Sequence, residues 1–110
     1  MPAPQAQFIQ GTLDLLVLRT LLYGATHGHA IAKHIKQTSD ELTIETGSLY
    51  PALHRLEAQG LVSAEWRLSD KGKRAKYYKL TAAGRRHLTA EQSRWERFVT
   101  AMGRVLRPAE

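Results

Sequence analysis

Residues 46–60, TGSLYPALHRLEAQG, contain the pattern that decides the fold of this 110-residue chain. Their leucines recur at i, i+4 and i+7, on one face of an α-helix: Leu49, Leu53 and Leu56. Thr46 or Ser48 can cap this helix, and Gly60 can end it, because glycine readily adopts a left-handed backbone. Pro51 is compatible with it only in the first turn or so, since further in it would remove an intrahelical hydrogen bond. The face opposite the leucines is narrow and polar.

The period of the pattern changes from helical to alternating directly after this helix. Residues 62–68 carry apolar side chains at every second position: Val62, Ala64, Trp66 and Leu68. Residues 77–80 alternate in the same way, with Tyr78 and Leu80 as the apolar pair. Two such runs, joined by a turn over Ser69 to Arg74, predict an antiparallel hairpin.

Two further helices are expected before residue 46. Residues 13–23 have leucines on nearly every side of a helical wheel, so this first helix must be covered on two sides. A short connection over residues 26–28 leads to a second helix, in which Ile31 and Ile35 are spaced i, i+4. Residues 37–45 are polar and predict a loop.

A long final helix is predicted from Thr81, which can cap it, to about Leu106. Its apolar residues form a heptad-like seam: Leu88, Trp95, Val99, Met102 and Leu106. At 1.5 Å per residue this helix is roughly 39 Å long, more than so small a core can cover. Because the first helix also has apolar surface to spare, we expect a homodimer in which the final helix packs on the partner's first helix. The expected interface residues are Leu15, Leu18, Leu22, Leu88, Trp95, Val99, Met102 and Leu106.

Positive charge is concentrated in the hairpin. The chain has 16 Lys and Arg against 10 Asp and Glu, a net charge of +6. Residues 61–80 contain six cations and two anions, so they contribute +4 of that excess. Charge of one sign gathered in one short segment predicts a polyanionic partner.

Composition excludes several other kinds of site. The chain has no cysteine, which rules out disulfides, thiolate metal sites and a cysteine nucleophile. No apolar run approaches the roughly 20 residues of a membrane helix, and the first residues lack the basic start of a secretion signal, so we expect a cytoplasmic protein without a membrane partner. No nucleophile, base and orienting group can be assembled, so neither an enzyme nor a cofactor is expected. For His27, His29 and His34 we expect capping or solvent-facing roles rather than metal ligation.

The order of the elements predicts a mainly α fold with a small antiparallel β-hairpin. It is the order of a winged helix-turn-helix domain over residues 1–81, followed by a long C-terminal dimerisation helix over residues 82–110. An α-helix fits the major groove of double-stranded DNA, and the cations of a wing can lie on its phosphates. The expected DNA contacts are Thr46, Ser48, Tyr50, Pro51, His54 and Arg55 on the third helix and Lys71, Lys73, Arg74 and Lys76 in the hairpin. Glu57 is expected to form local ion pairs instead.

Several motifs, in order and spacing, resemble the PadR family of bacterial transcriptional regulators. They are GTLDLLVL at 11–18, HGHAIA at 27–32, GSLYPALHRLE at 47–57, GLV at 60–62, KYYKLT at 76–81 and the following Gly84. The resemblance runs from Phe8 to the end of the chain. It implies a homodimeric winged helix that usually represses transcription, and the single terminal helix resembles the short-tailed branch of that family.

The same resemblance adds two kinds of site. The resemblance implies DNA contacts from Gly28 and His29, which fall on the His-Gly-Tyr motif common in the family, and this chain has histidine in place of the tyrosine. Some members bind aromatic or drug-like ligands near the dimer axis, so Trp95 and Phe98 are candidates for an effector pocket; plain dimer packing is the alternative.

The leading functional hypothesis is a dimeric, sequence-specific repressor that occludes a promoter at a pseudo-palindromic operator and is released by a small-molecule effector. A winged-helix adaptor for other proteins, with a merely solubilising basic turn, is the alternative from another class. Non-specific coating of nucleic acid is the third. Salt-dependent binding to the chain's own promoter region, compared with random duplex, separates the three.

Overall fold

The computed structural model describes residues 3–68 and 70–107, with side chains from residue 11 onward. The elements in chain order are α1 (Ala3–Leu21), β1 (Thr26–His27), α2 (Gly28–Thr38), α3 (Thr46–Ala58), β2 (Val62–Leu68), β3 (Arg74–Leu80) and α4 (Ala82–Leu106). The mainly α fold with a small antiparallel sheet is therefore confirmed. Ser69 of the predicted turn and the ends of the two predicted domains, 1–2 and 108–110, lie outside the described residues.

The sheet has three strands rather than the two of the predicted hairpin. Its order is β1-β3-β2, and all pairs are antiparallel, with Thr26 opposite Tyr78 and Val62 opposite Leu80. β1 lies where the sequence predicts only a connection, because a strand of two residues is too short to show an alternating pattern. It ties the start of α2 to the wing formed by β2, β3 and their turn.

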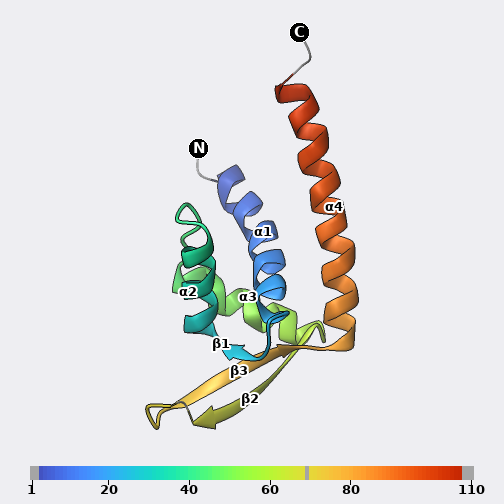
Figure 1. The fold of residues 1–110 in the computed structure, drawn as a ribbon. Coiled ribbons are helices and arrows are strands. Elements are labelled where there is room, and N and C mark those ends of the chain that lie inside the picture. Colours follow the sequence, from blue (N-terminus) through green and yellow to red (C-terminus); the bar gives the residue numbers. More distant parts are fainter. Residues whose placement is uncertain (1–2, 69, 108–110) are drawn as a thin grey trace.

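The core lies between the sheet and the first three helices, which cover one side of it (Figure 1). Leucines of α1 and α3 fill most of it, as the predicted helical faces require. Its largest fully buried side chains are Leu18, Leu21, Ile31, Leu49, Leu53, Leu56 and Val17. The opposite face of α3 is thereby left outside the core, where it remains open to a partner.

The start of α3 differs from the prediction. The N-cap is Glu45, whose backbone carbonyl accepts hydrogen bonds from the amides of Ser48 and Leu49, while its side chain makes no capping bond. Pro51 consequently lies in the second turn of α3 rather than the first. The helix tolerates it there because the carbonyl that loses its donor belongs to Gly47, which is exposed to water.

The junction between β3 and α4 is a single residue, Thr81. Its amide donates to the Leu61 carbonyl over 3.1 Å, and its hydroxyl donates to the Gly60 carbonyl over 2.7 Å. The same hydroxyl accepts the Gly84 amide over 2.9 Å, which confirms the predicted cap. A Cβ added at Gly84 would collide with the Leu61 carbonyl oxygen, so only glycine fits there. The wing and α4 are therefore joined without a flexible linker.

α4 runs beside α1 and then extends past the other elements (Figure 1). With this helix included, the molecule measures 59 × 30 × 24 Å. With 25 residues it is about 37 Å long. Its first turns are covered within the chain, since Leu88 is buried in the core. Its last turns are not, and Val99, Met102 and Leu106 remain exposed.

Candidate nucleic-acid interface

The outer face of α3 is an exposed, mostly polar surface. Five of the six residues predicted to contact DNA on α3, all except Arg55, are exposed: Thr46, Ser48, Tyr50, Pro51 and His54. The leucines anchor α3 from behind, so these side chains are held on a rigid element rather than on a loop. Such a face, on a helix whose leucines pack on the opposite side, can enter a major groove.

Gly28 is buried under Tyr50 rather than exposed. A Cβ at position 28 would lie 2.8 Å from the Tyr50 hydroxyl oxygen, so the ring needs a glycine at this point. The structure thus gives Gly28 a packing role that seats Tyr50 between α2 and the wing. His29, the next residue, is exposed beside it.

His27 caps α2. Its Nδ1 accepts the Ala30 amide over 3.2 Å, and its ring meets Tyr77 edge to face at 5.4 Å between centroids. The capping role expected for one of the histidines is therefore confirmed here, while His34 packs against Tyr23. Among the described residues, no group of three or more histidine, aspartate or glutamate side chains is arranged to hold a metal ion.

Arg55, an expected DNA contact, is held by an acid of α1. Its Nη2 lies 2.9 Å from Oδ1 of Asp14, and both side chains are partly buried. The sequence did not single out Asp14, because the partners are 41 residues apart and no local pattern joins them. The ion pair fixes the guanidinium at the side of α3 that faces α1, away from the wing.

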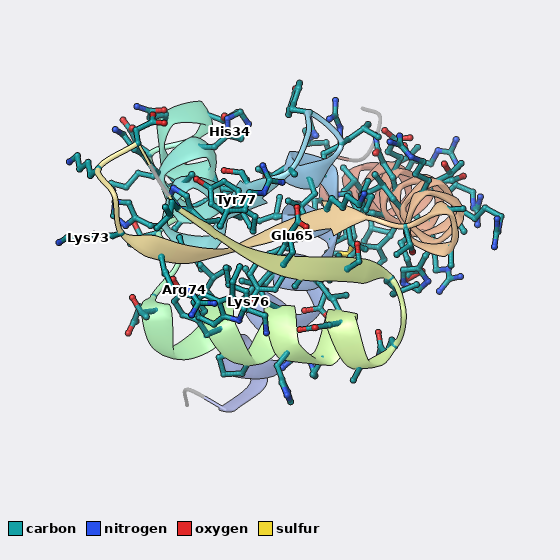
Figure 2. The ribbon with its side chains drawn as sticks, turned by 90° about the horizontal axis from the view of Figure 1, so that it is seen from below. His34, Glu65, Lys73, Arg74, Lys76 and Tyr77 are labelled. Carbon is teal, nitrogen blue, oxygen red and sulfur yellow. The ribbon has the colours of Figure 1, made fainter. Side chains whose placement is uncertain are left out.

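The wing carries the remaining predicted cations. Lys71, Lys73 and Arg74 are exposed, and Lys73 extends from the turn in Figure 2. Lys76 instead reaches α3, where its Nζ lies 3.2 Å from Oε1 of Glu57. Glu57 therefore forms an ion pair, as predicted, but with a residue of the wing 19 positions away rather than with a neighbour in the sequence. The Lys76–Glu57 ion pair therefore ties the wing to α3, and the exposed cations lie beyond it at the turn of the wing.

Tyr78 supports this surface from beneath. Burial raises the pKa of its phenol, with Lys76 acting in the opposite direction and Glu57 and Tyr50 adding to the rise. The ring stays neutral and apolar under ordinary conditions, and Lys76 lies 5.6 Å from its centre. The Tyr78 ring thus packs between α3 and β3 and supports the surface above it.

The residues predicted for the dimer interface fall into two groups. Leu18 and Leu88 are buried in the core of the single chain, so they do not belong to its free surface. The others are partly or fully exposed: Leu15, Leu22, Trp95, Val99, Met102 and Leu106. Phe98, of the expected effector pocket, is 5.7 Å from Trp95 between ring centroids and is also exposed.

An apolar cavity of about 360 Å³ lies between α1, the loop before α3 and α4. It is lined by Thr12, Leu13, Leu15, Leu16, Glu41, Leu42, Thr43, Ile44 and Trp95. Trp95 therefore lines a real concavity, and Phe98 lines a neighbouring one of about 300 Å³. The loop residues of this lining carry no pattern by which the sequence could have identified them.

Known proteins share both the sequence and the shape of this chain. A family model of the transcriptional regulator PadR-like family matches residues 17–90. Transcriptional regulator Rv3488 of Mycobacterium tuberculosis is 33% identical over 86 residues, which span 78% of each chain. A transcriptional regulator from Clostridium thermocellum is 29% identical, with a TM-score of 0.80, over 89% of this chain and 96% of that one.

A PadR-family regulator from Eggerthella lenta is 32% identical, with a TM-score of 0.78, over 97% of this chain and 92% of that one. Within residues 3–68 and 70–107, no helix is both long enough and apolar enough to cross a membrane. The family match covers the end of α1, all of α2, α3 and the wing, and the start of α4, so it includes the elements that form the surface described above. The chain belongs to the PadR-like family of transcriptional regulators.

Proposed function

We propose that this regulator is a homodimer that binds a pseudo-palindromic operator and represses transcription by occluding a promoter. The observation that carries the proposal is the exposed face of α3 beside a wing with exposed cations. α3 enters the major groove, where Ser48 and His54 reach base edges, and the wing neutralises phosphates. The proposal places the protein in the cytoplasm, with the DNA.

The dimer is supported by apolar surface that one chain leaves uncovered. On the last turns of α4, the exposed large apolar side chains are Phe98, Val99, Met102, Val105 and Leu106. A second copy that packs its α4 there, with Leu15 and Trp95 alongside, would cover them. A two-fold dimer presents two α3 helices, and its half-site centres should lie about one helical turn, or about 10 bp, apart.

An effector that enters the cavity at Trp95 would release the repressor. The cavity touches both α1 and α4, so a bound aromatic or drug-like molecule would change how these helices pack. A ligand shifts the equilibrium only as far as it prefers one of the two states. A change in Trp95 emission, as such a molecule is added, would be the first sign of binding.

Footprinting on the chain's own upstream region tests sequence-specific binding. We expect a protected site with two half-sites about one turn apart, and a mobility-shift affinity well above that for a random duplex of equal length. Equal affinity for both duplexes at all salt concentrations would instead indicate non-specific coating, and no binding to either would favour an adaptor.

Variants separate base contacts from phosphate contacts. His54→Ala should reduce the preference for the operator over random duplex. Replacing Lys73 and Arg74 together by alanine should weaken binding to both and flatten the salt dependence by about one unit per lost phosphate contact. Lys79→Ala, a change at an exposed lysine on the opposite face of β3, is the matched control.

Light scattering tests the dimer. The wild-type chain should have the mass of two copies at micromolar concentration, and Met102→Glu should shift it toward a monomer. A wild-type monomer under these conditions would refute the assembly proposed here.

A further inference from the structure

The face of the wing that enters the core continues past the edge of the core. Alternation places Val62, Ala64, Trp66 and Leu68 on one side of β2. Val62 is buried, but Trp66 is 58% exposed and Leu68 is 69% exposed. A large aromatic and a leucine thus lie side by side, uncovered, on the half of the wing nearest the turn.

This uncovered strip lies on the side of the sheet that faces α3. Trp66 is opposite Lys76 across the strands, and Lys76 reaches back to Glu57 of α3. Leu68 is opposite Arg74. Figure 2 shows the side chains of Arg74 and Lys76 in the space between the wing and α3. A duplex seated on α3 would therefore meet Trp66 next.

Arg74 stacks over Trp66. Its guanidinium carbon lies 5.2 Å from the centre of the ring, within the range of a cation–π contact. The contact limits the rotamers of the long, exposed Arg74 side chain. The guanidinium is therefore held along the wing. The pair therefore places the apolar ring of Trp66 and the positively charged guanidinium of Arg74 next to each other on the wing.

We propose that Trp66 and Arg74 together read the minor groove beside the site bound by α3, with Arg74 in the groove and Trp66 and Leu68 against its deoxyribose walls. Trp66 is a positioning residue for Arg74 as well as a contact. The inference rests on the proposed function, and it adds to it a residue and a sequence preference that a purely electrostatic wing would lack.

The preference follows from the shape of DNA. Runs of A·T pairs have a narrow minor groove with an enhanced negative potential, which attracts an inserted arginine. A cation held by Trp66 should therefore favour A·T-rich flanks, whereas lysines on phosphates cannot tell flanks apart. The cations of the turn also argue against the strip being covered by a second wing, because like charges would face each other.

The test uses two 30-bp duplexes with the same central sequence and flanks of either A·T or G·C pairs. We expect the wild-type chain to prefer the A·T flanks about two- to fivefold, the factor that one exposed cation–π contact supplies. Trp66→Ala should lose this preference, and Trp66→Phe, which keeps an aromatic plane, should retain most of it. Arg74→Lys, which keeps the charge, should lose it as well.

Two further measurements distinguish a contact from a structural role. Trp66→Ala removes no charge, so the slope of affinity against salt should stay as in the wild type while the flank preference disappears. Since the chain has two tryptophans, the emission change of Trp66 on binding is the part of the wild-type signal that Trp66→Phe lacks. The emission intensity of Trp66 should fall when the protein is saturated with either duplex.

The outcomes are distinct. Unchanged Trp66 emission on bound duplex, or a flank preference that survives Trp66→Ala, would overturn the inference. If the Trp66 part of the emission, taken as the wild-type signal minus that of Trp66→Phe, changes with protein concentration in the absence of DNA, the strip belongs to a protein contact and the inference is overturned too. Failure of the chain to prefer its own upstream region would overturn the proposed operator binding, yet the emission test still reads out on random duplex at low salt.

Discussion

Replacing Asp14 by asparagine should strengthen DNA binding. In the structure the Asp14 carboxylate holds Arg55 at 2.9 Å, with 31% and 36% of the two side chains exposed. A pair this accessible contributes at most about 1 kcal/mol to folding, so the variant should remain folded. It nevertheless releases a guanidinium at the edge of the α3 face and removes a negative charge that repels phosphate.

The size of the effect can be worked out. One additional phosphate contact steepens the slope of log affinity against log salt by about 0.9. Between 50 and 200 mM salt, Asp14→Asn should therefore lose about 3.5-fold more affinity than the wild type, and it should start from tighter binding at the low-salt end.

Fluorescence anisotropy with a labelled 30-bp duplex, titrated at four salt concentrations, measures both slope and affinity. Asp40→Asn, at an exposed acid of the loop between α2 and α3, changes the net charge equally and is the control. Identical slopes for Asp14→Asn and the wild type would show that Arg55 gains no contact when freed. Equal gains in both variants would show that net charge alone is responsible.

Three further predictions concern the frame that carries this surface. Gly84→Ala should destabilise the fold by about 1–3 kcal/mol, seen in urea unfolding, because the new methyl group meets the Leu61 carbonyl. Thr81→Val should cost about 1–2 kcal/mol through the lost cap, while Thr81→Ser, which keeps the hydroxyl, should cost far less; equal losses would refute a role for the hydroxyl. Burial raises the pKa of the Tyr78 phenol, so the unfolded chain loses the phenolic proton at lower pH than the folded chain does. The contribution of the neutral phenol to the free energy of unfolding is therefore complete below about pH 10, and it is lost as the pH rises through the pKa of the folded state. The loss of stability between pH 8 and pH 11 should be smaller in Tyr78→Phe, and an equal loss would contradict this.

Elements whose signals are local could be predicted from the sequence. The end of α3 at the left-handed Gly60, the cap at Thr81 and the two paired strands all follow from neighbouring residues. The alternating patterns of the two strands also run over enough residues to be recognised. The sequence indicates an ion pair of Glu57 but not its partner, Lys76 of β3, because 19 residues separate the two.

What the sequence could not show depends on distance in space. Asp14 meets Arg55 only because α1 crosses behind α3, and β1 exists only because β3 offers it an edge. Trp66 and Val62 have the same alternating pattern, yet one is exposed and the other buried. The pattern gives the side of a strand, but where the core stops depends on the length of the helices above it.

The single residue between β3 and α4 has a consequence for how such regulators can be rebuilt. A chimera that carries the terminal helix of a relative would gain more than a new preference for its dimer partner. Because only one residue joins β3 to α4, any change in the tilt of α4 must also move the wing. The swap should therefore alter the spacing of half-sites that the protein accepts. Partner choice and operator geometry would then be inherited together, and a designer could not exchange one as a separate module.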